Sequence, residues 1–334
     1  MNPHALSITE VVMKIALVFP GYGSQFVGMG KELYDQNRTV QEYFDEASSC
    51  LDINFLKLCF ASSELEIGMM NHAYTSIFLV SSAISALLKE AGVQPAVVAG
   101  FNLGEYSAFF AANSISLPDG LYLLNKLALF YEEMLKDAAY EVVRVHGVTA
   151  EIMEKICVEA SMEGSKAQIA IYFGEMDNAV SGHKEAVQRV RGLVFASNPE
   201  AVFEVLPIEV GLHADAMESV AQSFKMYLEK GDFKDLSIPL ISATDGQVIT
   251  QGDAIKEHVI KLLVAPILWT RVLQMIGECD LIIEVGPGNT LESSIKAAYP
   301  NKLYQNVNKP SDIDKLKYIM ATVTTDTVTP DVET

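Results

Sequence analysis

Basic residues are scarce in this sequence. Lysine and arginine together number 24 against 43 aspartates and glutamates, which gives a formal net charge of −19 at pH 7. So negative a chain repels nucleic acid and anionic membrane surfaces, and no basic stripe offsets the charge. We therefore expect neither nucleic acid nor a membrane as a partner, and an acidic partner protein would need a local basic patch.

Cysteine and long apolar runs are also in short supply. The four cysteines have no C-x-x-C spacing, which argues against a zinc site and a disulfide framework. Apolar stretches such as "PAVVAGF" and "LIIEVG" are strand-sized, far below the roughly 20 residues of a membrane helix. Residues 1–12 lack the basic start and apolar core of a secretory signal. These absences predict a cytoplasmic protein without a bound metal.

Apolar segments of strand length alternate with helical patterns along most of the 334 residues. Strands separated by helices indicate a mostly parallel sheet covered on both faces. The predicted strands include "KIALVFP", "PAVVAG", "IPLISAT" and "DLIIEVG". The predicted helices lie within 24–60, 115–137, 149–163, 183–192, 215–231, 253–276 and 290–298.

Residues 139–208 have a different order of elements. They follow the order strand, helix, strand, strand, helix, strand, which is typical of a small ferredoxin-like unit. We therefore predict a large α/β subdomain made of residues 13–138 and 209–308, with residues 139–208 inserted as a second subdomain. Residues 309–334 form a C-terminal segment, which is polar from about residue 322 and is predicted to be disordered from there.

The stretch "PAVVAGFNLGEYSAFFAA", residues 95–112, predicts a buried strand, a tight turn and a helix. This is the setting of a nucleophile elbow with the pattern G-x-S-x-G, but position 102 is Asn. A carboxamide cannot be deprotonated by an imidazole and does not form acyl intermediates. Because Asn tolerates left-handed backbone, the elbow can keep its shape, and the helix N-terminus can still bind a carbonyl oxygen.

Five blocks of the sequence follow one another across about residues 14–308: "FPGYGSQFVGMGKELY", "GFNLGEYSAFFA", "LPIEVGLHADAM", "LVAPILWTRVL" and "IIEVGPGNTL". In order and spacing they resemble the malonyl-CoA:acyl carrier protein transacylase family. The resemblance implies a hydrolase-like α/β subdomain with a ferredoxin-like insert. It also implies a protein of fatty-acid or polyketide synthesis that works with an acyl carrier protein or a polyketide synthase module.

The same resemblance assigns roles to individual residues. In the family a Ser at the elbow attacks an acyl thioester and a His takes its proton; these positions match Asn102 and His213. The backbone N–H groups of Tyr22 and Leu103 match the oxyanion hole. No permanently bound cofactor is implied, and the possible ligand is acyl-CoA or a phosphopantetheine-linked acyl group. A histidine packed in a loop is the plainer interpretation of His213.

Other positions depart from the family pattern in the predicted acyl pocket. Phe101 stands where many relatives have His, and Leu127 stands at the Arg that pairs with the malonyl carboxylate, with Lys126 beside it. Tyr74 and Phe173 replace a Gln and an Asn. Gln25, in the first block, completes the predicted pocket residues. A pocket without the Arg fork loses its bidentate carboxylate contact, which favours an uncharged acyl group.

Three functions fit these observations. The first is a non-catalytic homologue that binds a carrier protein or a synthase module. The second is an acyltransferase or acyl-thioester hydrolase for a non-carboxylated acyl group, seen here as an inactive variant with Asn in place of Ser. The third uses His213 as a lone general base on a bound thioester. We also expect the His213 ring to face the elbow, with about 2.7–3.2 Å between heavy atoms of His213 and the Asn102 carboxamide. If the ring points away, only the first function stands.

Overall fold

A six-stranded sheet forms the larger part of the molecule. The computed structural model describes residues 13–135, 139–206, 213 and 217–326. The strands follow the order β10-β9-β1-β2-β7-β8, and all neighbours pair in parallel except β7 and β8. The predicted mostly parallel sheet is confirmed. Its strands are β1 (Ile15–Phe19), β2 (Val97–Gly100), β7 (Leu240–Ile241), β8 (Val248–Ile249), β9 (Leu281–Val285) and β10 (Leu303–Val307).

Helices cover both faces of this sheet, and alternate residues of β1 show how. Because side chains alternate across a strand, Leu17 and Phe19 belong to one buried cluster, whereas Ala16 and Val18 belong to another. The first cluster lies under α1 (Lys31–Gln36), α2 (Arg38–Leu51), α3 (Phe55–Ala61), α4 (Glu64–Gly68), α5 (Met70–Glu90), α6 (Gly104–Ala111), α7 (Leu117–Leu135) and α10 (Glu218–Lys230). The second lies under α12 (Trp269–Ile276) and α13 (Glu292–Ala298), and α11 (Gly252–Val264) contributes to both.

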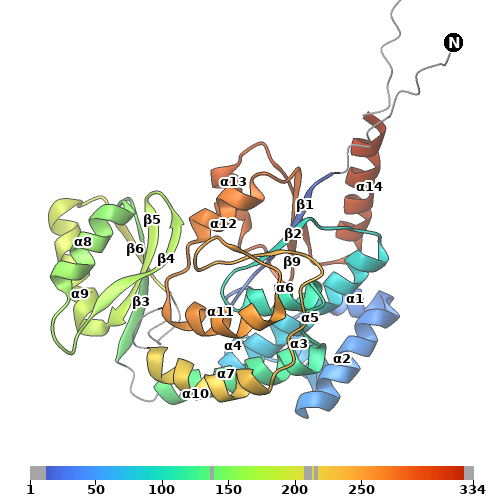
Figure 1. Ribbon diagram of the computed structural model, residues 1–334, viewed down its shortest axis with the longest axis horizontal. Coiled ribbons are helices and arrows are strands. Elements are labelled where there is room, and N and C mark those ends of the chain that lie inside the picture. Colours follow the sequence, from blue (N-terminus) through green and yellow to red (C-terminus); the bar gives the residue numbers. More distant parts are fainter. Residues whose placement is uncertain (1–12, 136–138, 207–212, 214–216, 327–334) are drawn as a thin grey trace, which may run out of the picture.

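A second, antiparallel sheet lies to one side of the first (Figure 1). Its strand order is β4-β5-β3-β6, and its elements are β3 (Tyr140–His146), α8 (Ala150–Ala160), β4 (Ala167–Gly174), β5 (Asp177–His183), α9 (Lys184–Ser197) and β6 (Val202–Val205). The predicted strand–helix–strand–strand–helix–strand order is confirmed. The predicted boundary at residues 208 and 209 lies outside the described residues, and the division into subdomains stays a prediction.

Two backbone hydrogen bonds join the second sheet to the larger part. Tyr172 N donates to Ile267 O at 2.8 Å, and Ile267 N donates to Ala170 O at 2.8 Å. These bonds tie β4 to the segment between α11 and α12. That segment belongs to the same side of the molecule as the second buried cluster.

The predicted helix over 253–276 is wrong. The chain forms α11 up to Val264 and begins α12 only at Trp269. Pro266 explains the break, because proline lacks a backbone N–H and disfavours helical backbone at the residue before it.

The prediction of disorder from about residue 322 is also wrong as far as residue 326. Helix α14 spans Pro310–Asp326, and its residues Ile313 and Leu316 are buried in the first cluster. Burial of this apolar face stabilises a helix whose later residues are polar. Residues 327–334 lie outside the described residues. In the part of the chain that is described, no helix is long and apolar enough to cross a membrane.

Candidate active site

The turn after β2 has the geometry of a nucleophile elbow. Asn102 has a left-handed backbone with φ 55°, Phe101 N donates to Phe19 O at 2.9 Å, and Glu105 N donates to Asn102 O at 3.0 Å. A Cβ at residue 104 would lie 2.7 Å from Pro20 O and even closer to Phe19 O, so only glycine fits there. The elbow lies at the carboxyl edge of the parallel strands, where α/β proteins bind their ligands.

The loop after β1 lies against this elbow. A Cβ at Gly21 would overlap the carbonyl oxygen of Phe101, so the two segments touch through backbone. Ser24 Oγ donates to Gly21 O at 2.8 Å, and the side-chain oxygen of Gln25 accepts from Gly23 N at 2.8 Å. Gln25, predicted as a pocket residue, therefore holds the shape of this loop.

The predicted oxyanion hole consists of two backbone donors, and this assignment stays a prediction. Tyr22 lies in the loop after β1, and Leu103 is the N-cap residue of α6. Among the described residues, neither backbone N–H donates a hydrogen bond. The positive end of the helix dipole adds to the attraction for an oxygen atom at this point. The loop and the helix N-terminus thus offer hydrogen-bond donors to a ligand.

His213 is buried, and its ring nitrogen Nδ1 is held by a hydrogen bond to a backbone carbonyl oxygen. Its ring is 1% exposed, and Nδ1 lies 2.7 Å from the carbonyl oxygen of Leu262, near the end of α11. Gln168 Nε2 donates to the His213 carbonyl oxygen at 3.3 Å, and the backbone of His213 is left-handed with φ 50°. Burial lowers the pKa of His213 to about 4, although the Leu262 carbonyl raises it. The imidazole is therefore neutral at pH 7.

The hydrogen bond expected between His213 and Asn102 is not formed. Nδ1 is used by the Leu262 carbonyl, and Nε2 has no partner among the described residues. The printed contact that orients the ring is therefore the one to the Leu262 carbonyl oxygen.

The low pKa of His213 predicts a pH dependence of stability. In the unfolded chain a histidine takes up a proton below about pH 6.5, whereas the folded ring stays neutral until about pH 4. The contribution of His213 to the free energy of unfolding should therefore be complete above pH 6.5, and about 3 kcal/mol of it should be lost as the pH drops to 4. Urea unfolding across this range measures it. The variant His213→Asn keeps a residue that tolerates the left-handed backbone, and its free energy of unfolding should fall less over the same pH range. Equal falls in the two proteins would contradict the prediction.

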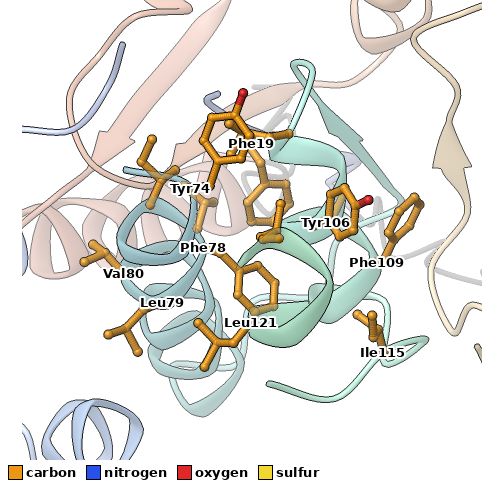
Figure 2. Close-up of a cluster of buried hydrophobic side chains, with 14 of the residues drawn as sticks. Phe19, Tyr74, Phe78, Leu79, Val80, Tyr106, Phe109, Ile115 and Leu121 are labelled. Atoms are coloured by element: carbon orange, nitrogen blue, oxygen red, sulfur yellow. The ribbon is translucent and has the colours of Figure 1, made fainter. Parts of the chain in front are cut away.

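Three tyrosines pack edge to face beside the loop after β1. Tyr74 lies 5.9 Å from the ring of Tyr22 and 5.9 Å from the ring of Tyr131. Figure 2 shows Tyr74 on α5 in the buried cluster with Phe78, Tyr106 and Phe109. Burial first, and then the neighbouring tyrosines, raise the pKa of the Tyr74 hydroxyl well above its ordinary value. Tyr74, which is predicted to replace a polar pocket residue, is therefore an uncharged aromatic side chain in this cluster.

Leu127 is part of the core. Its side chain is 3% exposed and belongs to the same buried cluster as Tyr74. Lys126 does not substitute for the missing Arg, because its Nζ lies over the rings of Tyr122 and Tyr227 at 5.5 and 5.9 Å. The side chains around Leu127 in this cluster are apolar and aromatic, and its role in an acyl pocket stays a prediction.

Phe101 and Phe173 contact each other across the junction of the two sheets. Their rings stack at 5.5 Å with an interplanar angle of 22°, and Trp269 meets Phe101 edge-on at 5.2 Å. On the other side, the Arg144 guanidinium lies 4.2 Å from the Phe173 ring centre and forms a bidentate ion pair with Asp177. The two departures from the family pattern therefore form one aromatic contact next to Asn102.

A buried carboxylate directly behind the elbow was not recognised in the sequence. Glu105, fully buried in the first turn of α6, pairs with His258 of α11 and accepts from Ala243 N at 2.9 Å. Burial lowers the pKa of His258, but the Glu105 charge more than offsets this and the pKa is raised overall. An acidic residue inside the otherwise apolar "GEYSAFFA" helix was the available signal, because a buried charge needs a partner.

Comparison with known proteins places this geometry in context. Residues 16–317 match the family described as acyl transferase domain. A malonyl CoA-acyl carrier protein transacylase of Bacillus subtilis (strain 168) is 32% identical over 287 residues, covering 85% of this chain and 90% of that protein. FabD from Acinetobacter baumannii is similar in structure, with a TM-score of 0.87 and 26% identity over 93% of this chain and 99% of that one.

A further structural relative was solved with a partner. It is a malonyl-transacylase in complex with its type II polyketide synthase acyl carrier protein. The TM-score is 0.87 and the identity 25%, over 92% of this chain and 99% of that one. The likeness extends over nearly the whole length of both chains.

Proposed function

This chain belongs to the acyl transferase domain family, and we propose that it serves fatty-acid or polyketide synthesis by binding an acyl carrier protein without forming an acyl-enzyme. The ligand at the elbow is the phosphopantetheine arm, with or without an acyl group, or the corresponding coenzyme A thioester. No permanently bound cofactor is required. A cytoplasmic location remains a prediction.

One observation carries the proposal: Asn102 occupies an elbow whose surroundings are otherwise prepared for a ligand. The turn is left-handed at residue 102, and the N–H groups of Tyr22 and Leu103 have no partner among the described residues. His213 is oriented by Leu262, yet a carboxamide offers it no proton to remove in a covalent step. The site is therefore suited to holding a thioester rather than to exchanging it.

The surroundings favour an uncharged acyl group. Leu127 stands where the family has the Arg that binds the malonyl carboxylate. Tyr74 and Tyr131 belong to the same buried cluster as Leu127. A malonyl carboxylate placed there would lose its water without gaining a cation, which is costly. This supports the second candidate function, an acyltransferase or thioester hydrolase for non-carboxylated acyl groups whose parent protein has Ser at position 102.

Intact-mass spectrometry and titration calorimetry test the proposal together. The purified chain should gain no acyl mass with acetyl-CoA, propionyl-CoA or malonyl-CoA, because residue 102 has no nucleophile. The same preparation should bind a carrier protein bearing its phosphopantetheine arm more tightly than the carrier protein without the arm. An acyl adduct mapped to residue 102 would contradict the non-covalent role, and equal binding of both carrier forms would contradict the ligand assignment.

A further inference from the structure

A cavity lies at the opposite end of α6 from the elbow. The helix begins at the elbow with Gly104, and its last turn contributes Phe110 and Ala111 to the wall of a cavity of about 640 Å³. Residues 92–95, which precede β2, form another part of the wall. Because α6 has eight residues and a helix rises 1.5 Å per residue, the two places are about 12 Å apart. The cavity is therefore separate from the candidate active site.

The inner wall of this cavity is apolar. It includes four side chains that are exposed by no more than 6%, namely Leu17, Leu88, Val93 and Ile115. Water gains few hydrogen bonds beside such side chains, so apolar ligand atoms replace it favourably. The volume also falls within the range of about 300–1,000 Å³ that is usual for small-molecule sites. The inner wall is thus suited to a hydrocarbon group.

The charged residues of the wall favour an anion. They are two lysines, Lys89 and Lys234, and two aspartates, Asp119 and Asp232. Asp119 is already used at the start of α7, where its carboxylate accepts from Ser116 Oγ at 2.5 Å and its N–H donates to the same oxygen at 3.2 Å. Two ammonium groups then remain against one carboxylate, in a chain whose net charge is −19.

The segment after α6 holds both lysines to the same part of the wall. Lys89 Nζ donates to Asn113 Oδ1 at 3.3 Å, and the next residue, Ser114, exchanges two hydrogen bonds with the backbone of Lys234 at 2.6 and 2.9 Å. An ammonium group has three donors, so Lys89 keeps two for a ligand. Among the described residues, the Lys234 ammonium has neither a hydrogen bond nor an ion pair.

We propose that this cavity binds a fatty acid, with the alkyl chain against the apolar inner wall and the carboxylate at Lys89 and Lys234. An alkyl chain needs no hydrogen-bond partner, whereas a carboxylate accepts strong, charge-assisted hydrogen bonds from ammonium groups. A cationic amphiphile of the same length would place like charges together. Since the cavity and the elbow lie at opposite ends of α6, the fatty acid does not compete with a ligand at Asn102.

Titration calorimetry of the full chain at neutral pH tests this site with hexanoate, octanoate and decanoate below their micelle concentrations. The affinity should rise about 4-fold for each added methylene, as expected for burial of a hydrocarbon chain. Decanoate should bind about 5- to 10-fold more tightly than 1-decanol, because it adds a charge to the hydrogen bond, and more tightly than decyltrimethylammonium.

Three variants make the test specific. Lys89→Gln combined with Lys234→Gln should remove the preference for decanoate over 1-decanol, whereas Lys315→Gln, an exposed lysine of α14 outside the cavity, should leave it unchanged. Ala86→Phe, which places a large side chain in the wall, should weaken the binding of both probes.

Equal affinities for decanoate and 1-decanol in the unmodified chain would overturn the inference, as would a preference that persists in the double lysine variant. Undiminished decanoate binding by Ala86→Phe would place the ligand elsewhere, and no binding of any probe would also contradict the site. None of these results bears on the proposed function, which is measured separately by the binding of the carrier protein.

Discussion

Replacing Asn102 with Ser should allow the chain to acquire a covalent acyl group. The elbow already has left-handed backbone at residue 102, and His213 Nε2 is held as a proton acceptor by the Leu262 carbonyl. We expect a Ser hydroxyl at this position to use Nε2 as its base and the backbone donors to hold the thioester carbonyl oxygen. We expect acylation at least about 1,000-fold faster than in the unmodified chain. Intact-mass spectrometry with peptide mapping measures the adduct and its position.

The same variant should discriminate between acyl groups. Acetyl-CoA and propionyl-CoA should load ahead of malonyl-CoA, because buried Leu127 offers the malonyl carboxylate no cation. Asn102→Ala controls for adducts elsewhere on the chain, and Asn102→Ser combined with His213→Asn tests the need for the base. Malonyl loading that equals or exceeds acetyl loading would show that the role given to position 127 is wrong.

Removing the carboxylate of Glu105 should destabilise the fold by about 3–5 kcal/mol. Glu105 is fully buried, and its loss leaves His258 charged or unpaired and the N–H of Ala243 without its acceptor. Breaking one side of a buried pair is costly because the remaining polar group keeps its desolvation penalty. The free energy of urea unfolding of Glu105→Leu measures the effect.

An exposed ion pair provides the comparison. Glu151 and Lys155 lie four residues apart on α8 with side chains 79% and 73% exposed, so Glu151→Leu should change stability by less than about 1 kcal/mol. Adding His258→Leu to Glu105→Leu should recover part of the loss, since the unpaired imidazole is removed. Equal urea midpoints of unfolding for Glu105→Leu and Glu151→Leu would contradict the assignment of Glu105 and His258 as a buried pair.

The secondary-structure elements and turns that depend on a few neighbouring residues were predicted from the sequence. Alternating apolar strands and helices predicted the parallel sheet, and the glycines around Asn102 predicted the elbow, because backbone constraints act over a few residues. The break after α11 was missed although Pro266 signals it. Helix α14 was missed because its stability depends on burying Ile313 and Leu316 against elements distant in sequence.

The site was less accessible from the sequence because its contacts join distant segments. Phe101 and Phe173 were each recognised as departures from the family, but no local pattern shows that their rings stack. The group that orients His213 is the backbone carbonyl of Leu262. Because every residue type has such a carbonyl, the side chain at position 262 could not have predicted this contact. Glu105 indicates that a partner exists, whereas His258, 153 positions away, is identified only by the fold.

The aromatic contact beside Asn102 also gives the protein a built-in optical probe. Trp269 is the single tryptophan of the chain, it is fully buried, and its indole N–H donates to Ser294 Oγ at 3.0 Å. Its ring touches Phe101, the residue next to the elbow, so a ligand that displaces Phe101 alters the surroundings of the indole. Intrinsic fluorescence therefore reports events at the elbow without a label and without interference from a second tryptophan.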